Sequence, residues 1–291
     1  MLLYSITAGI LYGLYFSLVG LGLNLVFGVM RIVNLAHGSF LMLGAFLAYW
    51  LFNLYGISPI YSAGAAFVLF ALLGLPLYYL LVPRLLQAKN PEMLSLILFF
   101  GMAQFIEALA SIVFGPTEHS IPGRALGPGP VSFFGQGLPR SWVISAAICA
   151  GAVLLIYLYL YRTRLGYVTR AVMVQRDEAE ASGVNVHRTS AIAFGISLGL
   201  AAAAGVMAPF MLGSITPAMG EPINVAAFAV IVIGSLGNPI GTLLGGMVYG
   251  VSLMLMQNYL SSWADLLPNL LLIAILLIRP EGLLGRKMRY A

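Results

Sequence analysis

No set of residues in this sequence has the spacing of a known catalytic or nucleotide-binding motif. A P-loop needs a lysine that follows glycine and precedes serine or threonine, and neither Lys89 nor Lys287 does. The three histidines lie too far apart for a paired-histidine metal site, and no Gly-x-Ser-x-Gly sequence occurs. We therefore expect no catalytic residue, no metal site and no cofactor bound by this chain itself.

Polar residues inside apolar segments are the candidates for a functional site. Glu107 lies in the apolar run 99–114, and Gln104 lies one helical turn earlier on the same face. A carboxylate in this position must face the bundle interior, water or a cation. It either marks a polar point on a substrate path or makes a structural hydrogen bond between helices, and the residue types alone leave both interpretations open.

Two breaks rich in glycine and asparagine interrupt the apolar runs, one in each half of the chain. Asn34–Gly38 is the first, and Ser235–Gly241 is the second. Paired breaks of this kind are typical of transporters with a repeated architecture and a central path, although two unrelated turns would look the same. The candidate residues of the path are Asn34, His37, Gly38, Ser39, Glu107, Ser235, Gly237 and Asn238.

Arg31, Asn34 and His37 are spaced by three residues, so on a helix they would share one face. We expect them to stabilise the first break by bonding its freed carbonyl groups. Because a carboxylate on the path would repel an anionic ligand, Glu107 is expected at the edge of the path or paired with Arg31.

The composition shows which elements must position these residues. Of the 291 residues, 61% are hydrophobic and only 8% are charged, whereas soluble domains carry about 25% charged residues. Lipid as the surrounding solvent allows apolar side chains to face outward. We predict an all-α polytopic membrane protein forming one domain over residues 1–291. It has about eight spanning helices, at 3–28, 38–55, 59–82, 92–114, 141–161, 190–212, 240–260 and 264–279.

One further apolar run, 225–236, is too short to span a membrane upright and is predicted to be a broken or re-entrant segment. The small-residue runs at 200–205 and 241–250 are predicted to be surfaces of close helix packing. Cys149 lies in an apolar run and is expected to be a small buried side chain.

The basic residues predict the orientation. If the turn at 29–37, the loops at 84–91 and 162–189 and the C-terminal tail are cytoplasmic, then all of the 14 lysines and arginines except Arg124 and Arg140 lie inside. Those two belong to the Gly/Pro-rich loop 115–140, which is then external. The N-terminus is predicted outside and the C-terminus inside.

The charged loop 162–189 is predicted to contain a short amphipathic cytoplasmic helix over 171–181 that Gly183 ends. It is either a docking element for a partner or simply a solvated loop.

Three segments carry a resemblance to a known family. Gly22–Phe40 is the first, Thr163–Asn185 contains the second, and Gly234–Gly241 together with Arg279–Gly285 forms the third. They resemble the Liv-type (leucine/isoleucine/valine) permeases of ABC importers along nearly the whole chain. The H-type permease is the closer match, because the chain is short and lacks an extra N-terminal span.

The resemblance implies an importer in the bacterial plasma (inner) membrane. Its partners would be a second, M-type permease, two cytoplasmic ABC ATPases that bind ATP and Mg²⁺, an external (periplasmic) substrate-binding protein and the lipid bilayer, with no nucleic acid. It also implies that 171–185 is the coupling helix that enters a cleft on an ATPase. The coupling candidates are Arg170, Arg176, Asp177, Glu178, Ala179 and Gly183.

The resemblance favours branched-chain or related amino acids as substrate. This chain has Ser39 where the family often has glutamate, and no lysine beside Asn224, so urea, short amides and aromatic acids stay open as alternatives. Two other classes remain as rivals. A stand-alone secondary transporter would leave the 162–189 loop without a role, and an intramembrane enzyme would need a catalytic pair that the sequence does not contain.

Overall fold

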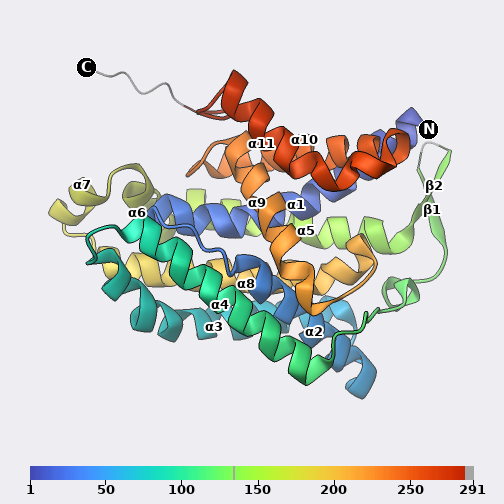
Figure 1. Cartoon of the computed structure of the whole chain (residues 1–291), viewed down its shortest axis with the longest axis horizontal. Helices are drawn as coiled ribbons and strands as arrows, with labels where there is room; N and C mark the ends of the chain where they lie inside the picture. The colour runs from blue at the N-terminus through green and yellow to red at the C-terminus, as the bar shows by residue number, and fades with distance from the viewer. Residues whose placement is uncertain (134, 286–291) are drawn as a thin grey trace.

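A computed structural model describes residues 1–133 and 135–285 of this chain. Within them, nine helical segments are long and apolar enough to cross a membrane. Most of the helices run roughly side by side, and two ends of the bundle carry other elements (Figure 1). We call these the hairpin end, where strands β1 (Pro130–Phe133) and β2 (Gln136–Pro139) lie, and the α7 end, where α6 (Arg164–Val174) and α7 (Arg176–Ala181) lie.

The order of the helices follows the predicted spans closely, which confirms the all-α polytopic fold. The spanning helices are α1 (Leu2–Met30), α2 (His37–Tyr55), α3 (Pro59–Leu86), α4 (Pro91–Phe114), α5 (Arg140–Arg162), α8 (Val186–Leu212), α9 (Gly220–Gly234), α10 (Pro239–Tyr259) and α11 (Leu267–Ile278). Short 3₁₀ turns precede two of them, at Pro217–Met219 before α9 and Ser261–Leu266 before α11, and a third lies at Gly123–Leu126.

The structure adds two features to the prediction. α9 begins five residues before the predicted run 225–236, because Gly220 to Asn224 already form its first turn. With the preceding 3₁₀ turn, the segment is 18 residues long and is one of the nine candidate spans, which corrects the expectation that it is too short to cross a membrane. The loop 115–140 contains the antiparallel β1–β2 hairpin, in which Pro130 pairs with Pro139 and Val131 with Leu138.

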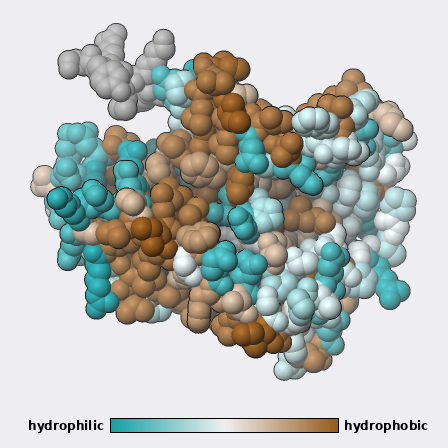
Figure 2. Space-filling view, viewed as in Figure 1, coloured by the Kyte–Doolittle hydropathy of each residue, from teal (hydrophilic) through white to brown (hydrophobic). Residues whose placement is uncertain are grey.

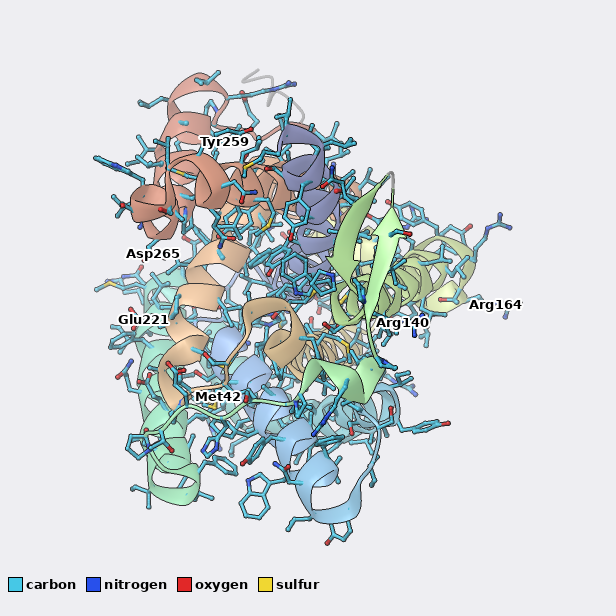
Figure 3. The ribbon with its side chains drawn as sticks, turned by 90° about the vertical axis from the view of Figure 1, so that its right-hand side faces the viewer. Met42, Arg140, Arg164, Glu221, Tyr259 and Asp265 are labelled. Carbon is cyan, nitrogen blue, oxygen red and sulfur yellow. The ribbon has the colours of Figure 1, made fainter. Side chains whose placement is uncertain are left out.

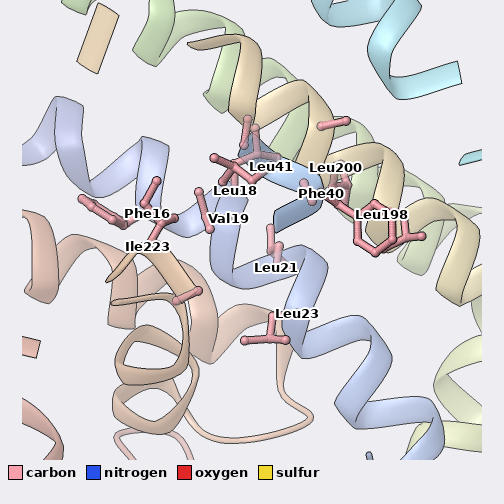
Figure 4. Close-up of a cluster of buried hydrophobic side chains, with 14 of the residues drawn as sticks. Phe16, Leu18, Val19, Leu21, Leu23, Phe40, Leu41, Leu198, Leu200 and Ile223 are labelled. Carbon is pink, nitrogen blue, oxygen red and sulfur yellow. The ribbon is translucent and has the colours of Figure 1, made fainter. Parts of the chain in front are cut away.

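α1 and α8 form the centre of the bundle and are buried along most of their length, whereas α4 and α11 expose most of theirs. Figure 4 shows part of the core, where Leu18 and Leu21 of α1 lie near Leu41 of α2 and Leu198 of α8. Cys149 is fully buried, as predicted.

Glycine allows the central helices to approach each other closely. A Cβ atom on Gly250 of α10 would collide with the backbone of Gly13 in α1, and one on Gly205 of α8 would collide with the Leu41 carbonyl oxygen in α2. Both glycines belong to the small-residue runs predicted to be packing surfaces, and that prediction is confirmed.

Candidate path and coupling sites

The first break turns back into the protein before α2 begins. α1 ends where Arg31 adopts a left-handed conformation (φ 57°). His37, the first residue of α2, places its Nε2 atom 3.0 Å from the carbonyl oxygen of Val19. Val19 lies 11 residues before Met30, which is about 16 Å along α1. α2 therefore starts well inside the bundle.

Asn34 shapes this break. Its side-chain Oδ1 accepts a hydrogen bond from the backbone N–H of Ala36 (3.1 Å), and its carbonyl accepts one from the N–H of His37 (3.2 Å). Asn34 and His37 are both fully buried. Residues 31–36 are not helical, so the predicted common face of Arg31, Asn34 and His37 does not form. A turn forms in place of a helix here, because the side chain of Asn34 accepts a hydrogen bond from the backbone N–H two residues ahead.

The second break lies at a different level along α1. The N–H of Gly237 donates to Oδ1 of Asn24 (2.6 Å), and Nδ2 of Asn24 donates to Thr242 Oγ1 (2.5 Å). Asn238 caps α10 by accepting from the N–H of Gly241 (3.2 Å). Ser235 has a positive φ of 111° and is buried beneath Gly282.

The two breaks therefore have separate surroundings. The first lies beside Val19 and Gly22 of α1, and the second beside Asn24 and Gly28. His37 and Gly38 are enclosed by protein in this chain, and a side chain at position 38 would collide with the carbonyl oxygen of Gly220. Gly38 therefore lies at a contact between α2 and α9. Of residues 34–39, only Leu35 and Ser39 line the cavity described next.

A cavity of about 250 Å³ joins the first break to α4 and α9. Its polar lining comprises Ser39 of α2, Gln104 and Glu107 of α4, and Glu221 and Asn224 of α9. Gln104 and Glu221 are exposed, whereas Asn224 is buried. Figure 2 shows hydrophilic surface near the centre of this face, with hydrophobic residues to its left, in the region where α4 and α9 approach each other in Figure 1.

Glu107 is not placed to pair with Arg31. Arg31 lines a different cavity together with Glu92, near the start of α4. Glu107 lies 15 residues further along the same helix, a rise of about 22 Å. The expectation of a Glu107–Arg31 pair is wrong, because Arg31 lies near the start of α4 and Glu107 lies in the second half of that helix.

A second, mostly apolar cavity of about 540 Å³ lies against the other side of α9. Phe16, Ile223, Tyr249 and Leu253 line it, with Asp265 as its only acidic residue. Seen from the hairpin end, Glu221 and Asp265 lie on the same side of the molecule, opposite Arg140 and Arg164 (Figure 3).

At the α7 end, α6 is attached firmly to α5 and α1. Thr163 caps α6 by accepting from the N–H of Gly166 (3.0 Å). Nε of Arg170 donates to the Leu160 carbonyl (2.9 Å), and its guanidinium lies over the rings of Tyr161 and Tyr167 at 4.3 and 4.9 Å. Arg170, one of the coupling candidates, thus holds α6 against the end of α5.

The predicted single helix over 171–181 is two helices. Gln175 is extended (φ −154°, ψ 99°) and separates α6 from α7. Gly183 ends α7, as predicted, with a φ of 86°. Its N–H donates to the Glu180 carbonyl and that of Val184 to the Ala179 carbonyl, which is the Schellman pattern.

The remaining coupling candidates all belong to α7 or its end. Asp177, Glu178 and Gly183 are exposed, Arg176 is half-buried, and Ala179 is buried. Between α6 and α7 lies a cavity of about 500 Å³ with Val174 and Glu178 on its rim. Leu165, Tyr167 and Val174 expose more than half of their surface here.

Comparison with known proteins decides the family. The family described as "Branched-chain amino acid transport system / permease component" matches residues 5–276. This chain belongs to that family. The permease is 31% identical to the probable branched-chain amino acid transport permease protein LivH of Methanocaldococcus jannaschii, over 95% of this chain and 90% of that protein.

Other relatives agree with this assignment. The permease is 26% identical to the high-affinity permease protein LivH of Escherichia coli K12, over 96% of this chain and 94% of the relative. The LivM permease of the same organism is 27% identical over 92% of this chain but only 67% of its own length. No solved structure matches. The resemblance to the H-type permease is confirmed.

Three residues important to the geometry of this permease were not among the sequence-based candidates. Asn24 connects α1 to the second break, and Glu221 and Asn224 bring α9 into the cavity beside Glu107. A single polar residue within an apolar run is the signal that could have identified Asn24 and Asn224.

Proposed function

We propose that this permease is the H-type transmembrane subunit of an ATP-driven importer of branched-chain or related amino acids. The α6–α7 element carries the proposal. It is anchored to α5 by Arg170, and it presents exposed apolar side chains and acidic residues at one end of the bundle. A rigid projection of this kind is suited to transmit the motion of an ATPase into the spanning helices, which a stand-alone secondary transporter would not need.

The face of the bundle that carries the cavity lined by Gln104, Glu107 and Glu221 supports the presence of a second permease subunit. Gln104 and Glu221 are exposed there, and Glu107, which is half-buried, lies seven residues, about 10 Å, before the end of α4. Polar side chains at membrane depth must face protein or water, since lipid leaves them unsatisfied. A partner permease on this face would enclose the polar cavity and separate it from lipid.

Copurification tests the assembly. A tagged copy of the chain, produced with its native partners and extracted in mild detergent, should retain two ATPase subunits and a second permease. After reconstitution with the external binding protein, the complex should accumulate labelled leucine only when ATP is supplied on the ATPase side. A chain that purifies alone and drives uptake from an ion gradient would instead support the secondary transporter. Uptake of urea or a short amide in place of leucine would support the alternative substrates.

Cysteine labelling tests the proposed orientation in the plasma membrane. Thr117→Cys in the 115–140 loop and Ser182→Cys after α7 are both exposed positions, and the native Cys149 is buried. An impermeant maleimide should label Thr117→Cys in intact cells and Ser182→Cys only after the membrane is opened, because 12 of the 14 basic residues lie on the Ser182 side. The unmodified chain is the control and should stay unlabelled. Labelling of both variants in intact cells would contradict the orientation. The tail residues 286–291, predicted to be inside, lie outside the described residues.

A further inference from the structure

The cavity of about 250 Å³ lined by Ser39, Gln104, Glu107, Glu221 and Asn224 has the features of a ligand site. It has the volume of about eight water molecules, which is enough for a small amino acid. Three separate parts of the chain form it: residues 35–39 at the start of α2, residues 100–107 in the middle of α4, and residues 221–225 at the start of α9. Chain segments far apart in the sequence therefore converge on one small polar space.

Two helices begin beside this cavity. Gly38, in the first turn of α2, contacts the backbone of Gly220, the first residue of α9, so the two N-termini lie side by side. First-turn N–H groups have no partner within their own helix, and a helix N-terminus carries a partial positive charge. The N-terminus of α2, whose first turn holds Ser39, favours a carboxylate nearby.

Asn224 is an independent sign of a ligand. Its side chain is 95% buried, since its relative exposure is 5%, and it lines the cavity. Its Oδ1 atom has no hydrogen-bond partner among the described residues. A buried acceptor without a partner is unfavourable, and native structures rarely keep one unless a ligand or water satisfies it.

The charges in the cavity have one sign. Glu107 and Glu221 both line it, and none of its lining residues is lysine, arginine or histidine. Two carboxylates that line one small cavity repel each other, and a cation between them removes that repulsion. An ammonium group has three N–H donors. The carboxylates of Glu107 and Glu221 offer acceptors at the cavity, and the enclosed Oδ1 of Asn224 becomes a third when its side chain turns toward the ligand.

We propose that this cavity is a transient subsite for a zwitterionic α-amino acid. The ammonium group of the substrate binds Glu107, Glu221 and Asn224, and its carboxylate lies at the N-terminus of α2 near Ser39. The inference rests on the proposed function and narrows its substrate class, because urea and short amides have no ammonium group to balance the two carboxylates. A charged hydrogen bond of this kind makes an amino acid bind roughly ten- to hundredfold more tightly than a ligand of the same shape without the ammonium group.

The first test measures ATP-driven uptake of labelled leucine by the complete transporter in proteoliposomes. Glu107→Gln and Glu221→Gln keep the size of each side chain and remove its charge, and each should lower uptake about tenfold or more. Glu92→Gln, on the same helix α4 but in a different cavity, and Glu118→Gln, in the external loop, should stay within about twofold of the unmodified transporter. Equal uptake by Glu107→Gln and Glu92→Gln would overturn the inference.

The second test measures ligand binding in the cavity by the rate of thiol modification, and it does not depend on transport. Gln104→Cys places a thiol on its lining, and a small polar thiol reagent that enters the cavity should modify it in the purified complex. L-Leucine should slow this reaction, whereas 4-methylpentanoate, which lacks only the amino group, should not. The protection should disappear in Gln104→Cys combined with Glu107→Gln. Equal protection by 4-methylpentanoate or by sodium ions would contradict the ammonium assignment.

The two tests separate failure of this inference from failure of the proposed function. If the transporter takes up leucine with ATP but leucine never protects Gln104→Cys, the importer remains and the subsite is wrong. If uptake does not depend on ATP but leucine still protects, the subsite is supported and the ATP-driven mechanism is wrong. If Glu107→Gln releases the second permease, Glu107 pairs with that partner and the inference is overturned.

Discussion

Replacing Gly250 with leucine is expected to destroy the contact between α1 and α10. A Cβ atom at this position would already collide with the backbone of Gly13 and would come within 2.5 Å of the Gly9 carbonyl oxygen. Backbone atoms cannot rotate away as a side chain does, so the two helices must separate. Overpacking at such a site costs about 3 kcal/mol or more, and the Tm in detergent should fall by roughly 6–12 °C.

Gly151→Leu is the matched control for this substitution. Gly151 lies in α5, is exposed, and has no atom within 4 Å of a Cβ built on it. Leucine favours a helix more than glycine does by about 1 kcal/mol, so Gly151→Leu should leave the Tm unchanged or raise it. Thermal unfolding followed by size-exclusion chromatography measures both variants. If the two variants have the same Tm, α1 and α10 do not pack as described.

Changing α7 is expected to uncouple ATP hydrolysis from transport while the chain still folds. Glu178 is exposed on α7, so Glu178→Arg reverses a charge on the proposed ATPase contact without disturbing the core. Gly183 ends α7 with a positive φ, so Gly183→Trp adds about 1–2 kcal/mol of local strain and a bulky side chain to the same surface. The double variant should lose leucine uptake about tenfold or more, together with stimulation of the ATPase.

Two controls separate coupling from general damage. Lys89→Glu reverses a charge in an exposed turn between α3 and α4, and Gly56→Trp adds the same kind of strain after α2, where φ is 66° and no atom lies near. Both should retain most of the uptake, and all variants should reach the membrane in equal amounts. Normal uptake by the double variant would show that α7 does not transmit the motion of an ATPase.

The sequence by itself determined the class of this permease and eight of its nine candidate spans. Low charge and long apolar runs leave few alternatives, because a helix in lipid must satisfy its own backbone and must be about 20 residues long. Gly183 as the end of α7 and the small residues as helix contacts were predictable for a similar reason. Each follows from a local property, the freedom of glycine at positive φ or the absence of a side chain.

The tertiary structure decided which polar residues meet. Periodicity places Glu107 and Gln104 on one face of α4, but it does not show that α9 brings Glu221 and Asn224 to the same cavity. Gln175 separates α6 from α7 without a glycine or proline nearby, so no local signal in the sequence marks that break. The first break returns about 16 Å into the bundle because His37 bonds Val19, a residue of another helix. Contacts between distant segments depend on how the helices pack together, and the local pattern of a sequence carries no record of that packing.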